Sequence, residues 1–155
     1  MIYDTIHFMQ RTVTSLEETK LFAEELVLVL KGKVSKDRAT LLLLHGDLGA
    51  GKTTLTKAIA KTLGVKENVQ SPTFVIQKNY ETTDDVFKRL VHIDAYRIED
   101  PKELLKIRIN ETLGLPKTLV IVEWPKQGGD VFANPDLELN LEFIDEQTRK
   151  ITFDN

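Results

Sequence analysis

The sequence predicts a three-layer α/β fold, with a mostly parallel central sheet, antiparallel edge strands and helices on both faces. Two short runs, residues 39–44 and 118–122, are predominantly apolar, as parallel strands buried on both faces are. A third run, residues 137–143, alternates apolar and polar side chains, which is typical of a half-buried strand. Helical patterns separate these runs, and this order is expected of crossover connections in a layered α/β protein.

The first half of the chain contains the expected elements in a clear order. Ser15 and Glu18 form a capping box before an amphipathic helix that stops at Gly32. A short edge strand is expected before this helix, at residues 6–8. The buried strand at 39–44 leads into a glycine-containing loop and then into a helix over residues 53–63, which the glycine at position 64 ends.

The second half is expected to add strands at both edges of the sheet. Strands over residues 74–81 and 86–94 are expected to form a hairpin, because the segment between them is polar. Pro101 is well placed to begin a helix. Near the C-terminus, residues 151–153 are expected to pair with the strand at 137–143 across a polar turn.

Length and composition predict one globular domain over residues 1–155. The chain is 41% hydrophobic and 29% charged, and its longest apolar run is far too short to span a membrane. Without a secretory signal pattern at the N-terminus, we expect a cytoplasmic protein with no membrane association. The absence of cysteine excludes disulfides and thiolate metal sites. A net charge of −3 argues against broad nucleic-acid binding and favours protein partners.

The stretch Gly46-Asp-Leu-Gly-Ala-Gly-Lys52-Thr53 fits the phosphate-binding loop pattern G-x-x-x-x-G-K-[ST] at every specified position. Because it lies between a buried strand and a helix, the fold is expected to be P-loop NTPase-like. We expect the loop to bind the phosphates of ATP, with Lys52 at the β- and γ-phosphates and Thr53 at Mg²⁺. The expected nucleotide-binding residues are Asp47, Leu48, Gly49, Ala50, Gly51, Lys52, Thr53 and Thr54.

Two carboxylates are expected to complete the site. Asp94 and Glu123 each follow an apolar strand, and strand-end carboxylates face the crevice where ligands of open α/β sheets bind. Either one could hold Mg²⁺ while the other orients or deprotonates the attacking water. Thr73, on a loop stiffened by a proline, is expected to sense the γ-phosphate. His92 lies on the same strand face as Asp94, either near the phosphates or packed within the sheet.

Four motifs in this order resemble the TsaE family of bacterial P-loop ATPases: the phosphate-binding loop, Ser71-Pro-Thr-Phe74, His92-Ile-Asp-Ala-Tyr-Arg97 and Val122-Glu-Trp-Pro125. The resemblance implies a Mg²⁺-dependent ATPase that supports the TsaD–TsaB heterodimer in forming N6-threonylcarbamoyladenosine in tRNA. The tRNA itself would be reached only through that complex. The resemblance also implies that Lys52, Thr73, Asp94 and Glu123 are catalytic and that Thr53, Asp94 and Glu123 serve the metal.

The chain departs from the family pattern at two places. Arg108 stands where a glycine is usual, and Lys126 begins a segment that in many relatives opens with an acidic residue. Both departures lie beside the site or on a plausible docking surface. They bear on partner contacts more than on the nucleotide chemistry.

Two other functions stay open at the level of the sequence. A small-molecule kinase would also use the phosphate-binding loop, although no arginine-bearing lid segment is apparent in the chain. A binding module that holds nucleotide without turnover would need the same loop, since slow hydrolysis is expected of a P-loop protein without its partner. A GTPase is excluded, because the chain contains no Asn-Lys-x-Asp segment for reading guanine.

Overall fold

The computed structural model describes residues 10–154 and contains a seven-stranded sheet in the order β1-β7-β6-β2-β5-β4-β3. The neighbours β6, β2, β5 and β4 run parallel, whereas β7, β1 and β3 are added antiparallel on the two sides. The predicted sheet is therefore confirmed. The strands are β1 (Gln10–Val13), β2 (Thr40–His45), β3 (Gln77–Glu81), β4 (Arg89–Asp94), β5 (Thr118–Glu123), β6 (Leu137–Phe143) and β7 (Arg149–Asp154).

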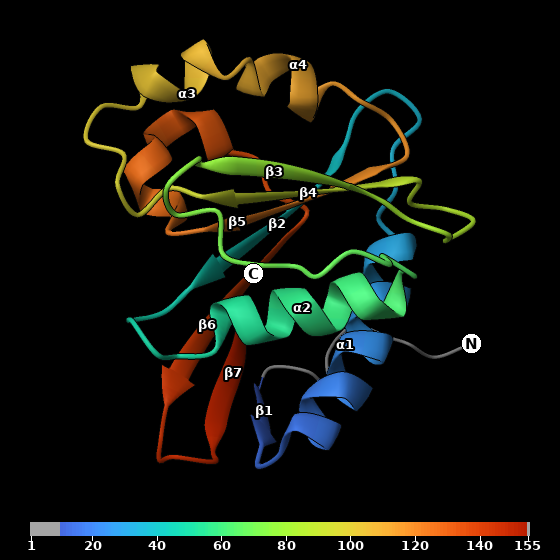
Figure 1. Ribbon diagram of the computed structural model, residues 1–155, viewed down its shortest axis with the longest axis vertical. Helices are drawn as coiled ribbons and strands as arrows, with labels where there is room; N and C mark the ends of the chain where they lie inside the picture. The colour runs from blue at the N-terminus through green and yellow to red at the C-terminus, as the bar shows by residue number, and fades with distance from the viewer. Residues whose placement is uncertain (1–9, 155) are drawn as a thin grey trace.

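Helices cover both faces of the sheet, as Figure 1 shows. On one face lie α1 (Leu16–Lys31) and α2 (Lys52–Thr62). On the other lie α3 (Lys102–Lys106), α4 (Ile109–Leu113) and the 3₁₀ segment η1 (Pro125–Phe132). Successive residues of β2 and β5 enter the two cores in turn, which explains why these strands are apolar at nearly every position.

Helix α1 begins at the predicted cap. The Ser15 Oγ accepts a hydrogen bond from the Glu18 backbone N–H at 3.1 Å. The Glu18 carboxylate accepts from the backbone N–H of Thr14 at 2.6 Å, one residue before the usual partner in a capping box. The hairpin of β6 and β7 also forms as predicted, with Leu141 opposite Ile151.

Several boundaries differ from the prediction. Strand β3 begins at Gln77 rather than at residue 74, because a turn precedes it and Ile76 has a φ of 68°. The helix expected from Pro101 is divided into α3 and α4 at Arg108, whose φ is 58°. No sequence pattern predicted strand β1 or segment η1. The edge strand predicted at 6–8 lies outside the described residues, and within residues 10–154 no helix has the length and apolar character to cross a membrane.

Candidate functional site

The loop between β2 and α2 is shaped by glycines with positive φ angles. Gly46, Gly49 and Gly51 have φ values of 145°, 80° and 96°, which side chains of L-residues rarely allow. A β-carbon at Gly46 would also lie only 2.4 Å from the carbonyl oxygen of Leu141 on β6. Backbone conformation therefore requires glycine at all three positions, and close contact with the sheet adds a second requirement at Gly46.

Lys52 is the first residue of α2, and its side chain folds back over the loop. Its Nζ donates hydrogen bonds to the carbonyl oxygens of Gly46 and Asp47, the latter at 3.0 Å. The same atom lies 4.1 Å from the centre of the Trp124 ring. Burial lowers the pKa of the Lys52 ammonium, although nearby carboxylates, Glu123 foremost, oppose this shift. Both hydrogen bonds of this ammonium go to neutral carbonyls, so a charged phosphate oxygen could replace either acceptor with a stronger one.

Glu123 ends β5 and is held by side chains from two other elements. Its Oε1 accepts a hydrogen bond from the Thr53 hydroxyl at 2.8 Å, and its Oε2 lies 2.9 Å from Nε2 of His92 on β4. Glu123 is 2% exposed and His92 is 0% exposed. Of the two positions open to His92, the structure shows the one packed within the sheet, where the ring contacts an acidic residue of the site.

Asp94 ends β4 and lies beside Glu123 in the register of the parallel sheet. Its Oδ2 accepts hydrogen bonds from the hydroxyls of Ser71 at 3.1 Å and Thr73 at 2.8 Å. Its Oδ1 accepts from the backbone N–H of Tyr96 at 2.9 Å. The Asp94 carboxylate thus holds the loop that carries Thr73 against the end of β4 through hydrogen bonds.

One cavity of about 470 Å³ brings most of the predicted site residues together. Its lining includes the loop from Leu48 to Thr54 and also Thr73, Asp94 and Glu123. Asp47 is the exception among the predicted nucleotide-binding residues, because it lines a neighbouring cleft and offers its backbone oxygen to Lys52. The predicted residues that line this cavity come from four separate segments of the chain, and a fifth segment adds Arg149 to the lining.

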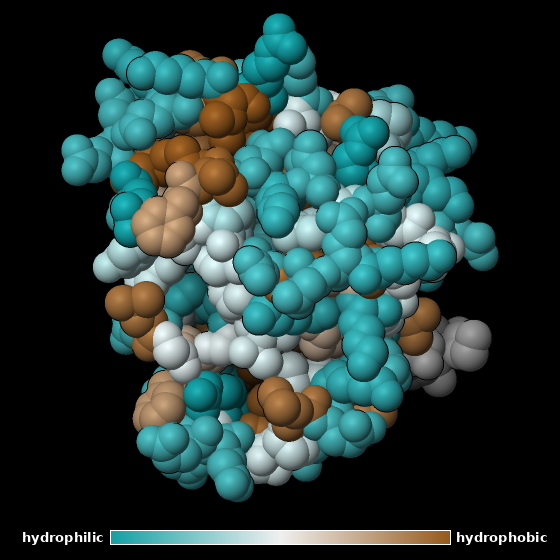
Figure 2. Space-filling model, in the orientation of Figure 1, coloured by the Kyte–Doolittle hydropathy of each residue, from teal (hydrophilic) through white to brown (hydrophobic). Residues whose placement is uncertain are grey.

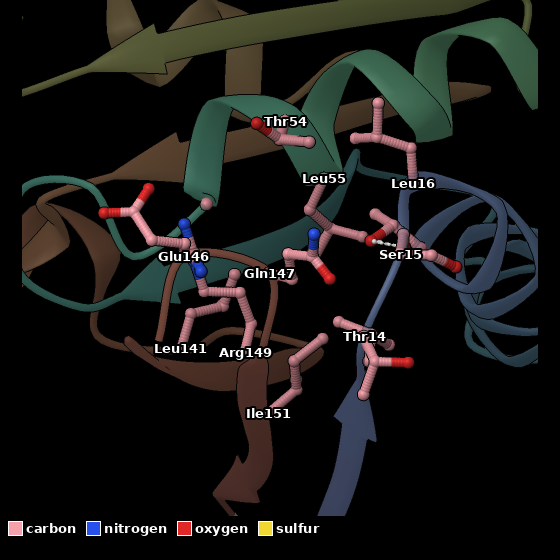
Figure 3. Close-up of a pocket in the computed structure, with 13 residues that line it drawn as sticks. Thr14, Ser15, Leu16, Thr54, Leu55, Leu141, Glu146, Gln147, Arg149 and Ile151 are labelled. Carbon is pink, nitrogen blue, oxygen red and sulfur yellow. Dashed lines mark hydrogen bonds between the residues drawn. The ribbon is translucent and has the colours of Figure 1, made fainter. Parts of the chain in front are cut away.

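A second cavity, of about 400 Å³, adjoins the first and appears in Figure 3. The two cavities share Gly51, Thr54 and Arg149. No motif in the sequence pointed to Arg149, because a lone arginine after a turn carries no pattern. The apolar part of the second lining consists of Val13, Leu16, Leu55, Leu141 and Ile151.

The oxygen groups of the first cavity fit a divalent cation that arrives with phosphates. Among residues 10–154, no cluster of three or more histidine, cysteine or acidic side chains is arranged to hold a metal ion. Mg²⁺ does not require such a cluster, because it is usually bound through one or two carboxylates, phosphate oxygens and water. The Thr53 hydroxyl and the carboxylates of Glu123 and Asp94 are donors of this hard type.

Comparisons with known proteins match most of the chain. A family model described as "Threonylcarbamoyl adenosine biosynthesis protein TsaE" matches residues 13–151. A protein of Aquifex aeolicus named "tRNA threonylcarbamoyladenosine biosynthesis protein TsaE" is 37% identical over 139 residues, covering 88% of this chain and 89% of that protein. The protein of the same name from Bacillus subtilis is 36% identical over 148 residues, which cover 92% of this chain and 82% of the Bacillus subtilis protein.

A solved structure extends the likeness to three dimensions. The crystal structure of YdiB from Bacillus subtilis superposes with a TM-score of 0.70 at 28% sequence identity. The superposition covers 96% of this chain and 86% of YdiB. The match to the family model over nearly the whole described chain, together with relatives above 30% identity, shows that this chain belongs to the TsaE family.

Proposed function

We propose that this chain binds and hydrolyses ATP with Mg²⁺, and that hydrolysis supports the formation of N6-threonylcarbamoyladenosine in tRNA. The observation that carries the proposal is the convergence of Lys52, Thr53, Thr73, Asp94 and Glu123 on one cavity. A glycine loop, a buried lysine and strand-end carboxylates are the groups that phosphoryl transfer to water requires. The names of the Aquifex aeolicus and Bacillus subtilis relatives support the pathway.

Phosphate binding falls to the loop and to Lys52. The Lys52 ammonium contacts two neutral carbonyl oxygens, and a charged phosphate oxygen forms a stronger hydrogen bond with an ammonium than a carbonyl does. The backbone N–H groups at the start of α2 add the partial positive charge of a helix N-terminus. We therefore assign the β- and γ-phosphates of ATP to this end of the cavity.

The two carboxylates take different roles in the proposal. We assign Glu123 to the metal together with Thr53, because the hydroxyl of Thr53 lies 2.8 Å from the Glu123 carboxylate. Mg²⁺ bound there supplies charge neutralisation of the phosphates. Asp94 is left to orient or deprotonate the attacking water. Its Oδ2 accepts from both Ser71 and Thr73, so a turn of Thr73 toward the γ-phosphate would remove one of two donors and leave room at that oxygen for the water.

We assign the ribose and the base to the second cavity. It begins at Gly51 and Thr54, where the phosphate cavity ends, so a nucleotide extended along the start of α2 would enter it. Its apolar side chains suit the faces of a purine, since small-molecule pockets combine apolar walls with a few polar groups.

Exposed apolar side chains around the phosphate cavity support a protein partner on this face. Leu48, on the loop, is 71% exposed, and Phe74 and Val75, directly after Thr73, are 83% and 63% exposed. Figure 2 shows hydrophobic groups interrupting a mostly hydrophilic surface. Apolar groups of this kind mark interaction sites when they cluster. We assign this face to the TsaD–TsaB heterodimer, through which the tRNA would be reached.

Phosphate release from ATP and Mg²⁺, measured with and without TsaD–TsaB, tests the proposal. Lys52→Ala is the blank. Asp94→Asn should lower the stimulated rate about 100-fold or more, the usual cost of losing a general base, and leave ATP affinity nearly unchanged. The matched control is Asp85→Asn, because Asp85 is a fully exposed acid between β3 and β4, beyond the opposite end of β4. Tight ATP binding without stimulation would instead favour the small-molecule kinase or the passive nucleotide binder.

A further inference from the structure

A further cavity lies between α1 and α2 and has no role in the function proposed above. Its volume is about 360 Å³. From α2 it is lined by Thr54, Lys57, Ala58 and Lys61, which recur at helical spacing and so form one stripe on the helix surface. The first residues of α1 form the opposite wall, and both helices lie on the same face of the sheet (Figure 1). We call this cavity the interhelical groove.

The interhelical groove gathers three positive charges that the protein leaves unpaired. They belong to Lys20 of α1 and to Lys57 and Lys61 of α2. None of the ion pairs and side-chain hydrogen bonds formed among residues 10–154 includes these lysines. Glu17 supplies the single carboxylate of the lining, and none of these ion pairs includes it either. Lysines four residues apart on a helix repel each other, so an anionic partner would relieve a cost that the protein itself does not offset.

An exposed leucine lies among these charges. Leu16, the first residue of α1, lines the groove and is 77% exposed. The cap at Ser15, whose Oγ accepts from the Glu18 N–H at 3.1 Å, fixes the start of the helix on which Leu16 lies. An apolar centre with a cationic rim fits a polypeptide segment in which acidic residues flank an apolar one. A nucleic acid fits less well, because its phosphates would leave Leu16 unused and the net charge of −3 on the chain opposes them.

The interhelical groove is continuous with the surface around the phosphate cavity. Thr54 lines the phosphate cavity, the second cavity and the groove, so a protein that covers the first of these also reaches the last. We propose that the groove binds an acidic segment of the partner protein, with an apolar side chain against Leu16 and carboxylates against the three lysines. The proposal rests on the function proposed above, which assigns that partner to TsaD–TsaB, and it adds a charged docking site to the face described there.

Phosphate release from ATP at increasing concentrations of TsaD–TsaB tests this site. The groove variant, Lys57→Glu with Lys61→Glu, should raise the concentration needed for half-maximal stimulation about tenfold or more, because carboxylates of the partner would then face like charges. Glu17→Gln should lower that concentration about twofold, because it removes the repelling carboxylate from the groove. Both effects should shrink at high salt. The matched control, Lys36→Glu with Lys117→Glu, makes an equal change of charge on exposed residues shortly before β2 and β5, at the opposite end of these strands from the phosphate-binding loop.

The possible outcomes separate this site from the function on which it rests. Equal half-maximal concentrations in the groove variant and in the control would overturn the site while leaving the partner assignment intact. ADP affinity, measured by calorimetry, should match that of the control; a tenfold loss would overturn the proposal, because the lysines would then act on the nucleotide. Binding of isolated tRNA by the wild type that the groove variant loses would overturn it in favour of nucleic acid. Absence of stimulation in the wild type would refute the partner assignment, and this site with it. Thermal unfolding of each variant verifies that the protein assayed is folded.

Discussion

Replacing His92 with leucine removes the buried donor that holds Glu123. The His92 Nε2 lies 2.9 Å from the Glu123 Oε2, and neither side chain is more than 2% exposed. In the proposed role as a metal ligand the Glu123 carboxylate is an acceptor only, and His92 then supplies the hydrogen. In the variant, Oε2 keeps only a contact of 3.2 Å to the Thr53 hydroxyl.

This loss should appear in both stability and turnover. We expect His92→Leu to lower the free energy of unfolding by about 1–3 kcal/mol, the cost of leaving a buried polar group unpaired. In a domain of this size each kcal/mol lowers Tm by about 2–4 °C. Turnover should fall more than ATP affinity, because His92 contacts a carboxylate rather than the loop. His92→Gln should restore much of both, because its amide can donate from a position similar to Nε2.

Thermal unfolding and TsaD–TsaB-stimulated phosphate release should be measured on the same preparations of the wild type, His92→Leu and His92→Gln. Titration with Mg²⁺ adds a readout that lower stability alone would not move. If Glu123 loses its orientation, a higher Mg²⁺ concentration should be needed for half-maximal turnover. Wild-type turnover and Mg²⁺ dependence in His92→Leu would refute the reasoning. An equal loss in His92→Gln would show that the shape of the imidazole matters rather than its donor.

Two further predictions concern stability. Arg108→Gly should raise the free energy of unfolding, measured with urea, by about 1 kcal/mol, because glycine adopts the Arg108 φ of 58° without strain. Little is lost in exchange, since the 3.7 Å ion pair of Arg108 with Glu111 is exposed. An unchanged free energy of unfolding would contradict this prediction. Asp136→Asn should lower the free energy of unfolding by about 1–3 kcal/mol at neutral pH, since Asp136 accepts hydrogen bonds from the Arg38 guanidinium and the Leu41 N–H. Burial raises the pKa of Asp136, but these hydrogen bonds lower it overall. The difference in unfolding free energy between variant and wild type should therefore be complete above the ordinary carboxyl pKa and should vanish as the pH falls through the lowered value. A difference that does not change with pH would contradict the prediction.

The fold and the site could be predicted where one physical requirement dominates the choice of residue. The run at 118–122 is apolar because β5 is covered by helices on both faces. The loop glycines are required by positive φ angles, and Gly46 also by its contact with β6. Asp94 and Glu123 could be selected in advance because each directly follows an apolar strand, and the structure shows these two strands to be parallel neighbours.

Other features depend on backbone angles and long-range contacts that no local sequence pattern predicts. Ile76, Arg108 and Trp124 have positive φ angles, which their residue types do not favour, so the late start of β3 and the break between α3 and α4 gave no signal. Arg149 reaches the phosphate-binding loop only because β7 pairs with β6, and β6 with β2. Such a contact follows from the assembled sheet rather than from the residues around position 149.

Three polar side chains of the site already have partners within the protein, and under the proposed function this decides how a nucleotide would act on it. Lys52 contacts loop carbonyls, Thr53 contacts Glu123, and Thr73 contacts Asp94. A nucleotide that binds as proposed would exchange these contacts for charge-assisted ones, so its affinity would reflect the difference between the two sets. The hydroxyl hydrogen of Thr73 can be donated to Asp94 or to a γ-phosphate, but not to both. Since exposed Phe74 follows Thr73 directly, a partner bound there would respond to which of the two contacts is made.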